Sequence, residues 1–116
     1  MKKNKPMPAN YLEKVPVRNE KIGFSTDEKG IVTLEIENKG AFNKFAQLLF
    51  KKPKISYVHL DENGSFVWLQ IDGKRSIFAI APLVDEHFGE AAHPLYERLA
   101  KFFQILESYR FIKWKE

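Results

Sequence analysis

The sequence predicts an α+β fold, in which a three-stranded antiparallel sheet is followed by a cluster of three helices. In residues 21–26, 31–37 and 55–60, apolar and polar side chains alternate with the period of half-buried strands. From residue 61 onward, apolar residues recur with helical spacing instead. A chain of 116 residues is long enough for one domain with a single modest core.

The first two strands are predicted to form a β-hairpin. The intervening sequence Asp-Glu-Lys-Gly is typical of a turn, because Gly30 can adopt a positive φ. The side chains expected to face the core are those of Ile22, Phe24, Val32, Leu34 and Ile36.

Residues 38–54, between the second and third strands, predict an additional short helix. Phe42, Phe45 and Leu49 recur at helical spacing, and Pro53 prevents the helix from continuing. We therefore expect an inserted helix over residues 41–52 whose apolar side packs on the domain.

The third strand leads directly into a helix. In the strand, Ile55, Tyr57 and His59 share one face, and the residues between them share the other. Asp61 is placed to cap the helix that follows, and Trp68 is expected to be one of its core residues. The Asp-Gly pair at residues 72 and 73 ends the helix.

Two more helices are predicted in the C-terminal part. Ser76 can cap a helix over residues 77–87 that Gly89 ends; Pro82 requires either a kink there or a regular helix that begins near the proline. The last helix should run from Ala91 or Pro94 to Tyr109, and residues 111–115 predict a terminal strand or ordered tail. Together, these elements have the arrangement of a winged helix-turn-helix.

Residues 1–20 are expected to be a flexible or extended lead-in to a single domain over residues 21–116, with a possible edge strand within residues 11–19. No apolar run is long enough for a signal peptide or a membrane span, so we expect a cytoplasmic protein.

Little in the sequence favours an enzyme. The chain contains no cysteine, and His59, His87 and His93 are expected to be structural residues. Nucleotide-binding glycine motifs and the nucleophile motif of the hydrolases are absent. We expect no catalytic residue, no metal and no cofactor.

The strand-to-helix stretch and the turn after it resemble the PqqD family (pyrroloquinoline quinone biosynthesis protein D). The resemblance covers residues 21–112 and rests on Leu60, Asp61, Glu62, Val67, Trp68, Ile71, Asp72, Gly73, Lys74, Arg75, Phe88 and Gly89. It implies a winged helix-turn-helix module that recognises ribosomally made precursor peptides. Such modules capture the leader segment as an added strand and present the peptide to a modifying enzyme, commonly a radical S-adenosylmethionine enzyme. The inserted residues 41–52 depart from the compact form of the family.

The last predicted helix has a wide apolar arc, about half of its circumference. A small domain rich in phenylalanine could bury this arc on two sides; alternatively, part of it lines a peptide-binding groove beside the third strand. The resemblance favours the groove, whose expected residues are Lys54, Ile55, Tyr57, His59, Tyr96, Arg98, Leu99, Lys101 and Phe103. Arg98, Lys101 and Lys54 would favour a peptide with acidic residues around its apolar anchors.

The alternative function is a winged-helix DNA-binding protein. The net charge of +4 is compatible with nucleic acid or with an acidic partner. However, the polar face of the last helix includes Glu97 and Glu107, which phosphate would repel. A peptide-binding adaptor without catalytic activity is therefore the preferred interpretation, with no membrane or nucleic-acid partner.

Overall fold

The computed structural model describes residues 9–37 and 55–116. The predicted helix over residues 41–52 and the site residue Lys54 lie outside this part of the chain. The described residues divide into two compact units, residues 20–37 with 55–65 and residues 9–19 with 66–116. They are called the sheet unit and the helical unit below.

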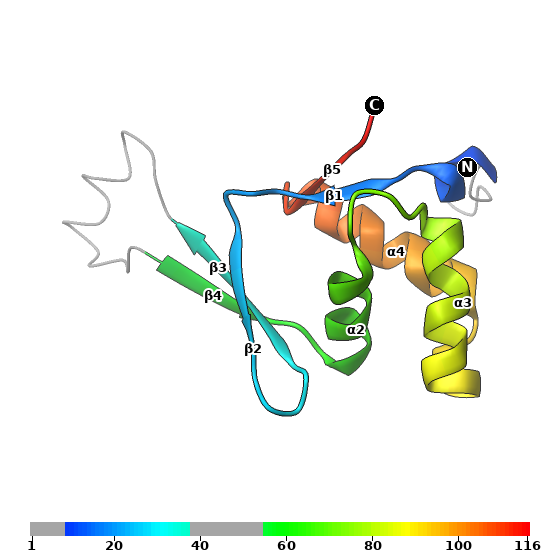
Figure 1. Cartoon of the computed structure of the whole chain (residues 1–116), viewed down its shortest axis with the longest axis horizontal. Helices are drawn as coiled ribbons and strands as arrows, with labels where there is room; N and C mark the ends of the chain where they lie inside the picture. The colour runs from blue at the N-terminus through cyan, green and yellow to red at the C-terminus, as the bar shows by residue number, and fades with distance from the viewer. Residues whose placement is uncertain (1–8, 38–54) are drawn as a thin grey trace, which may run out of the picture. The chain divides into compact units, whose positions relative to one another are not determined.

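The sheet unit is a three-stranded antiparallel sheet, as the sequence predicted (Figure 1). Its strands are β2 (Gly23–Thr26), β3 (Val32–Glu37) and β4 (Ile55–His59), in the order β2-β3-β4. The predicted hairpin turn is present: Gly30 has a φ of 85°, and the Asp27 carboxylate accepts a backbone hydrogen bond of 2.9 Å from Ile31.

A buried serine connects the strands to the helix that follows. The Val32 N–H donates to Ser65 Oγ over 2.8 Å, and the Ser65 hydroxyl donates to the Leu60 carbonyl over 3.4 Å. The Leu60 N–H in turn donates to the Val32 carbonyl. The Ser65 hydroxyl thus bridges the Val32 N–H and the Leu60 carbonyl, which would bond directly to each other in a regular antiparallel ladder.

Helix α2 (Glu62–Gln70) begins as predicted, because the Asp61 carboxylate accepts a hydrogen bond from the Gly64 N–H over 2.7 Å. Trp68 is fully buried, which confirms its assignment to the core. After α2, the backbone N–H groups of Lys74 and Arg75 both donate to the Asp72 carboxylate, and Gly73 has a φ of 77°. These hydrogen bonds are the main cause of the lowered pKa of Asp72.

Helix α3 (Ile77–Phe88) is capped by Ser76, whose hydroxyl accepts from the Ala79 N–H, and ended by Gly89, as predicted. Pro82 lies inside this helix, so the regular helix does not start at the proline. The Phe78 carbonyl has no N–H partner on Pro82, one turn later.

The last helix starts later than one of the two predicted positions. A short 3₁₀ helix, η2 (Gly89–Ala92), precedes α4 (Leu95–Ser108). Ala91 therefore belongs to a separate turn, and Pro94 immediately precedes the helix, where a proline removes no helical hydrogen bond.

Both ends of the described chain meet in the helical unit (Figure 1). A 3₁₀ helix, η1 (Ala9–Glu13), precedes β1 (Pro16–Arg18), which pairs antiparallel with β5 (Ile112–Trp114). The possible edge strand and the terminal strand are thus confirmed, as partners of each other.

The position of Pro16 suits this pairing. Hydrogen bonds from Lys115 N to the Val15 carbonyl and from Asn19 N to the Phe111 carbonyl define the ladder. Because ladder bonds alternate along an antiparallel strand, the backbone of Pro16 points away from β5. The missing N–H of proline therefore removes no bond between the strands.

Arg18 on β1 contacts the buried Trp68 of α2 within the helical unit. The Arg18 guanidinium lies 5.8 Å from the centroid of the Trp68 ring and donates two hydrogen bonds, of 3.1 and 2.8 Å, to the Ile71 carbonyl. Trp68 is fully buried in this unit, together with Pro16, Ile71, Ile77, Ile80, Phe103 and Leu106, whereas Arg18 is half-buried. Among the described helices, none is long and apolar enough to cross a membrane.

Candidate functional site

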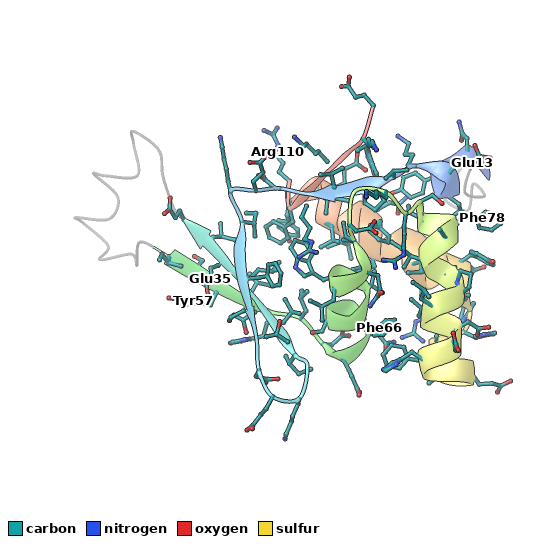
Figure 2. The ribbon with its side chains drawn as sticks, in the orientation of Figure 1. Glu13, Glu35, Tyr57, Phe66, Phe78 and Arg110 are labelled. Atoms are coloured by element: carbon teal, nitrogen blue, oxygen red, sulfur yellow. The ribbon has the colours of Figure 1, made fainter. Side chains whose placement is uncertain are left out.

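The predicted strand face exists. The register pairs Tyr57 with Glu35 and Ile55 with Glu37, so these side chains share one side of the sheet. Figure 2 shows Tyr57 and Glu35 together on β4 and β3. Tyr57 is 60% exposed, and Ile55 and His59 are exposed as well. This side of the sheet is therefore open to a partner.

The backbone of β4 offers a free edge. The bond from Leu60 N to the Val32 carbonyl shows which residues of this strand point toward β3. By the alternation of an antiparallel ladder, Val58 also points toward β3, whereas Ile55, Tyr57 and His59 direct their N–H and C=O groups outward. In the described sheet β4 pairs with β3 alone. Three consecutive outward positions are thus available to an added strand.

The other edge of the sheet, β2, is shorter. The bond from Asp27 N to the Ile31 carbonyl indicates that only Phe24 and Thr26 direct their backbone groups outward in this four-residue strand. With five residues and three outward positions, β4 is the better template for strand addition, and β2 provides a matched control edge.

Each of the three histidines has a different partner. His59 Nδ1 is 2.8 Å from Thr33 Oγ1, His87 stacks on Phe66 at 4.2 Å between ring centroids, and His93 Nε2 is 2.7 Å from Asp85 Oδ1. His87 and His93 are separated by five residues, a spacing that zinc motifs also use. No group of three potential metal ligands occurs among residues 9–37 and 55–116.

Two of the α4 residues assigned to binding from the sequence are core residues. Phe103 is fully buried and Leu99 is 3% exposed. Tyr96, Arg98 and Lys101 are exposed. The Tyr96 ring lies 5.7 Å from that of Phe78, and both rings face solvent in part.

Exposed apolar side chains also occur on the side of α4 opposite to Tyr96. Ile105 is 45% exposed and Tyr109, just after the helix, is 66% exposed, while Phe102 is half-buried. The Tyr109 ring stacks on that of Phe111 at 5.5 Å. Helical spacing places Phe102, Ile105 and Tyr109 on one side of α4, so the sequence already indicated an apolar surface there. The sequence did not show which side of the helix the core would cover.

Near the N-terminus of the helical unit, Lys14 Nζ lies 5.3 Å from the Trp114 ring and 5.9 Å from the Tyr11 ring. Burial, and to a smaller extent the negative charge of Glu107, raises the pKa of Tyr11 to about 12. The Tyr11 hydroxyl has no hydrogen-bond partner among the described residues. We therefore assign a packing role to these aromatic residues and not a role in binding.

The structure thus brings Ile55, Tyr57 and His59 together in the sheet unit. The residues Tyr96, Arg98, Leu99, Lys101 and Phe103 all lie on α4 in the helical unit. The strand edge is the surface whose geometry is specific for a ligand, because a row of outward N–H and C=O groups matches an extended peptide backbone.

A family model described as Coenzyme PQQ synthesis protein D (PqqD) matches residues 31–112 of the chain. No curated protein and no solved structure showed significant similarity to the chain.

Proposed function

The chain belongs to the PqqD family, and from this membership we propose that it is a non-catalytic adaptor for a precursor peptide. The adaptor binds the leader segment of a ribosomally made peptide and presents it to a modifying enzyme of the radical S-adenosylmethionine class, in the cytoplasm. The small sheet followed by three helices is consistent with the winged helix-turn-helix form of such recognition modules.

The observation that supports this proposal most directly is the free edge of β4. An extended leader segment placed beside it can pair with the outward backbone groups of Ile55, Tyr57 and His59. Such main-chain bonds hold any extended sequence, and the neighbouring side chains supply the preference for particular residues. No proton transfer or covalent step is needed for this role.

The experiment is a titration with a synthetic leader peptide from a precursor encoded beside this protein. Tyr57→Pro removes an outward N–H without removing a bond to β3 and should weaken binding by roughly tenfold or more. Thr26→Pro makes the same change on the β2 edge and should leave binding unchanged. Tyr57→Thr, which keeps the N–H, separates the contribution of the ring from that of the backbone.

Equal binding by the wild type and Tyr57→Pro would exclude strand addition at β4. Chemical-shift changes in the wild type provide a second readout and should include residues 55–60. Changes at Tyr96, Arg98 or Lys101 would extend the binding surface to the exposed residues of α4 that the sequence predicted.

A further inference from the structure

The exposed side of the sheet is acidic in a basic protein. The strands β2, β3 and β4 contain two carboxylates, Glu35 and Glu37, and no lysine or arginine, although the whole chain has a net charge of +4. The register places both carboxylates on the side of the sheet that carries Tyr57. We call this side the outer sheet face; its residues are Thr33, Glu35, Glu37, Ile55, Tyr57 and His59.

The neighbouring strand leaves space for the Glu35 carboxylate. A Cβ atom added at Gly23, the residue opposite Glu35 on β2, would lie 3.3 Å from Glu35 Oε1. Gly23 is not one of the glycines with a positive φ, so a side chain at this position would meet the end of the flexible Glu35 side chain and would not strain the backbone. The half-buried Glu35 side chain therefore leans over Gly23, on the β2 side of β3, and a rotation of this side chain would bring its carboxylate toward Tyr57, its partner in the register on β4.

An added strand would place its own side chains on the same face. In an antiparallel pair, residues directly opposite have Cβ atoms about 5 Å apart, so one peptide side chain would contact Tyr57. Glu35 would then lie two strands away, at about 10 Å, a distance that a long cationic side chain and the glutamate span together. The hydrocarbon part of that side chain would cover the Tyr57 ring.

We propose that the peptide bound at β4 carries an arginine or lysine opposite Tyr57, recognised jointly by the Tyr57 ring and the Glu35 carboxylate. This inference rests on the proposed function, because it assumes strand addition at β4. It assigns the opposite charge to the peptide from that expected on the basis of Arg98, Lys101 and Lys54. Arg98 and Lys101 lie on α4, Lys54 lies outside the described residues, and the outer sheet face has its own acidic charge.

The experiment uses a displayed library of random ten-residue peptides, selected on the full-length wild-type protein. Peptides that bind the wild type and still bind Tyr57→Thr, but do not bind Tyr57→Pro, are those that depend on the backbone of the β4 edge. Among them, we expect arginine or lysine to be enriched at one position of the aligned sequences. The same selection on Glu35→Gln should lose this enrichment, whereas Glu28→Gln, which removes a charge from the exposed hairpin turn, should keep it.

One selected peptide then measures the contact directly. Replacing its basic residue with glutamine should weaken binding to the wild type by roughly threefold to tenfold, the range expected for exposed cation–π and ion-pair contacts. The same replacement should have a clearly smaller effect on Glu35→Gln and on Tyr57→Thr. Added salt should reduce the wild-type preference, because the charges are exposed.

The outcomes separate the two levels of the proposal. Peptides that depend on the β4 edge but show no basic enrichment, or an enrichment that Glu35→Gln retains, would overturn this inference and leave strand addition intact. A library without any peptide that depends on the β4 edge would overturn both. Enrichment of aspartate or glutamate instead of basic residues would also overturn this inference.

Discussion

At the scale of single residues, Trp68 and Leu69 show how neighbours in one helix differ. Trp68 has no exposed surface and its ring contacts the Arg18 guanidinium, whereas Leu69 is 39% exposed. Trp68 also belongs to the residues that resemble the PqqD family. Its burial indicates that this part of the resemblance reports on the core and not on ligand contact.

Replacing Trp68 with alanine should lower the free energy of unfolding by about 3–5 kcal/mol, because a large cavity would form in the core. Leu69→Ala is the matched control and should cost clearly less. Chemical denaturation of both variants measures the difference. A Trp68→Ala protein with unchanged stability and lost peptide binding would identify Trp68 as a ligand contact instead.

Tyr11 predicts a specific response to alkaline pH. Its pKa in the folded protein is about 12, above the ordinary tyrosine value of 10.0, so between these pH values the folded state retains a proton that the unfolded chain loses. The contribution of Tyr11 to the free energy of unfolding should therefore be fully present below pH 10 and should be lost between about pH 10 and 12. In Tyr11→Phe this contribution to the decrease should be absent.

Denaturation at several pH values, with the ultraviolet absorbance of tyrosinate as a second readout, measures this effect. At neutral pH, Tyr11→Phe should change stability by less than about 1 kcal/mol, because the hydroxyl has no described partner. A loss of several kcal/mol at neutral pH would reveal a hydrogen bond of this hydroxyl.

At the scale of elements, Ser65 joins strands and helix. Its hydroxyl accepts a hydrogen bond from the Val32 N–H and donates one to the Leu60 carbonyl, so a side chain of α2 bonds to the first residue of β3 and to the residue that follows β4. An apolar side chain of similar size would leave the Val32 N–H buried without a partner, which costs more than the lost bond alone contributes.

Ser65→Ala should therefore destabilise the protein by about 1–3 kcal/mol. Ser25→Ala, at an exposed position of β2, should have little effect. Hydrogen exchange of the Val32 amide provides the local readout and should become faster in Ser65→Ala. Unchanged exchange at Val32 would mean that another acceptor replaces the hydroxyl.

At the scale of the whole molecule, the pairing of β1 with β5 joins segments from opposite parts of the sequence. The Lys113 backbone points toward β1 by the alternation that also accounts for Pro16. Lys113→Pro should remove a ladder bond and cost about 1–2 kcal/mol, whereas Lys113→Ala, at an exposed side chain, should be nearly neutral.

Hydrogen exchange of residues 15–19 tests this prediction, because loss of the pairing should raise their exchange rates together. Equal exchange in Lys113→Pro and Lys113→Ala would contradict the prediction, because it would show that the Lys113 N–H contributes nothing to the pairing.

The sequence alone determined the type and order of most described elements. Alternation in residues 55–60 reports directly on the two faces of a strand, and the caps Asp61 and Ser76 act on N–H groups within their own helix. Such signals are local, so they can be interpreted without knowledge of the fold. For this reason it was correctly predicted that Ile55, Tyr57 and His59 share one face of the strand.

The tertiary structure decided which surfaces are free. The wide apolar arc of α4 did not show that Phe103 would be buried and Tyr109 exposed, because burial depends on segments distant in sequence. Likewise, β1 and β5 have only three residues each, so their alternation of apolar and polar residues predicts a strand weakly. Their pairing with each other is visible only in the structure. The acidic outer sheet face emerged only from the register, which pairs Glu35 on β3 with Tyr57 on β4, 22 positions later in the sequence.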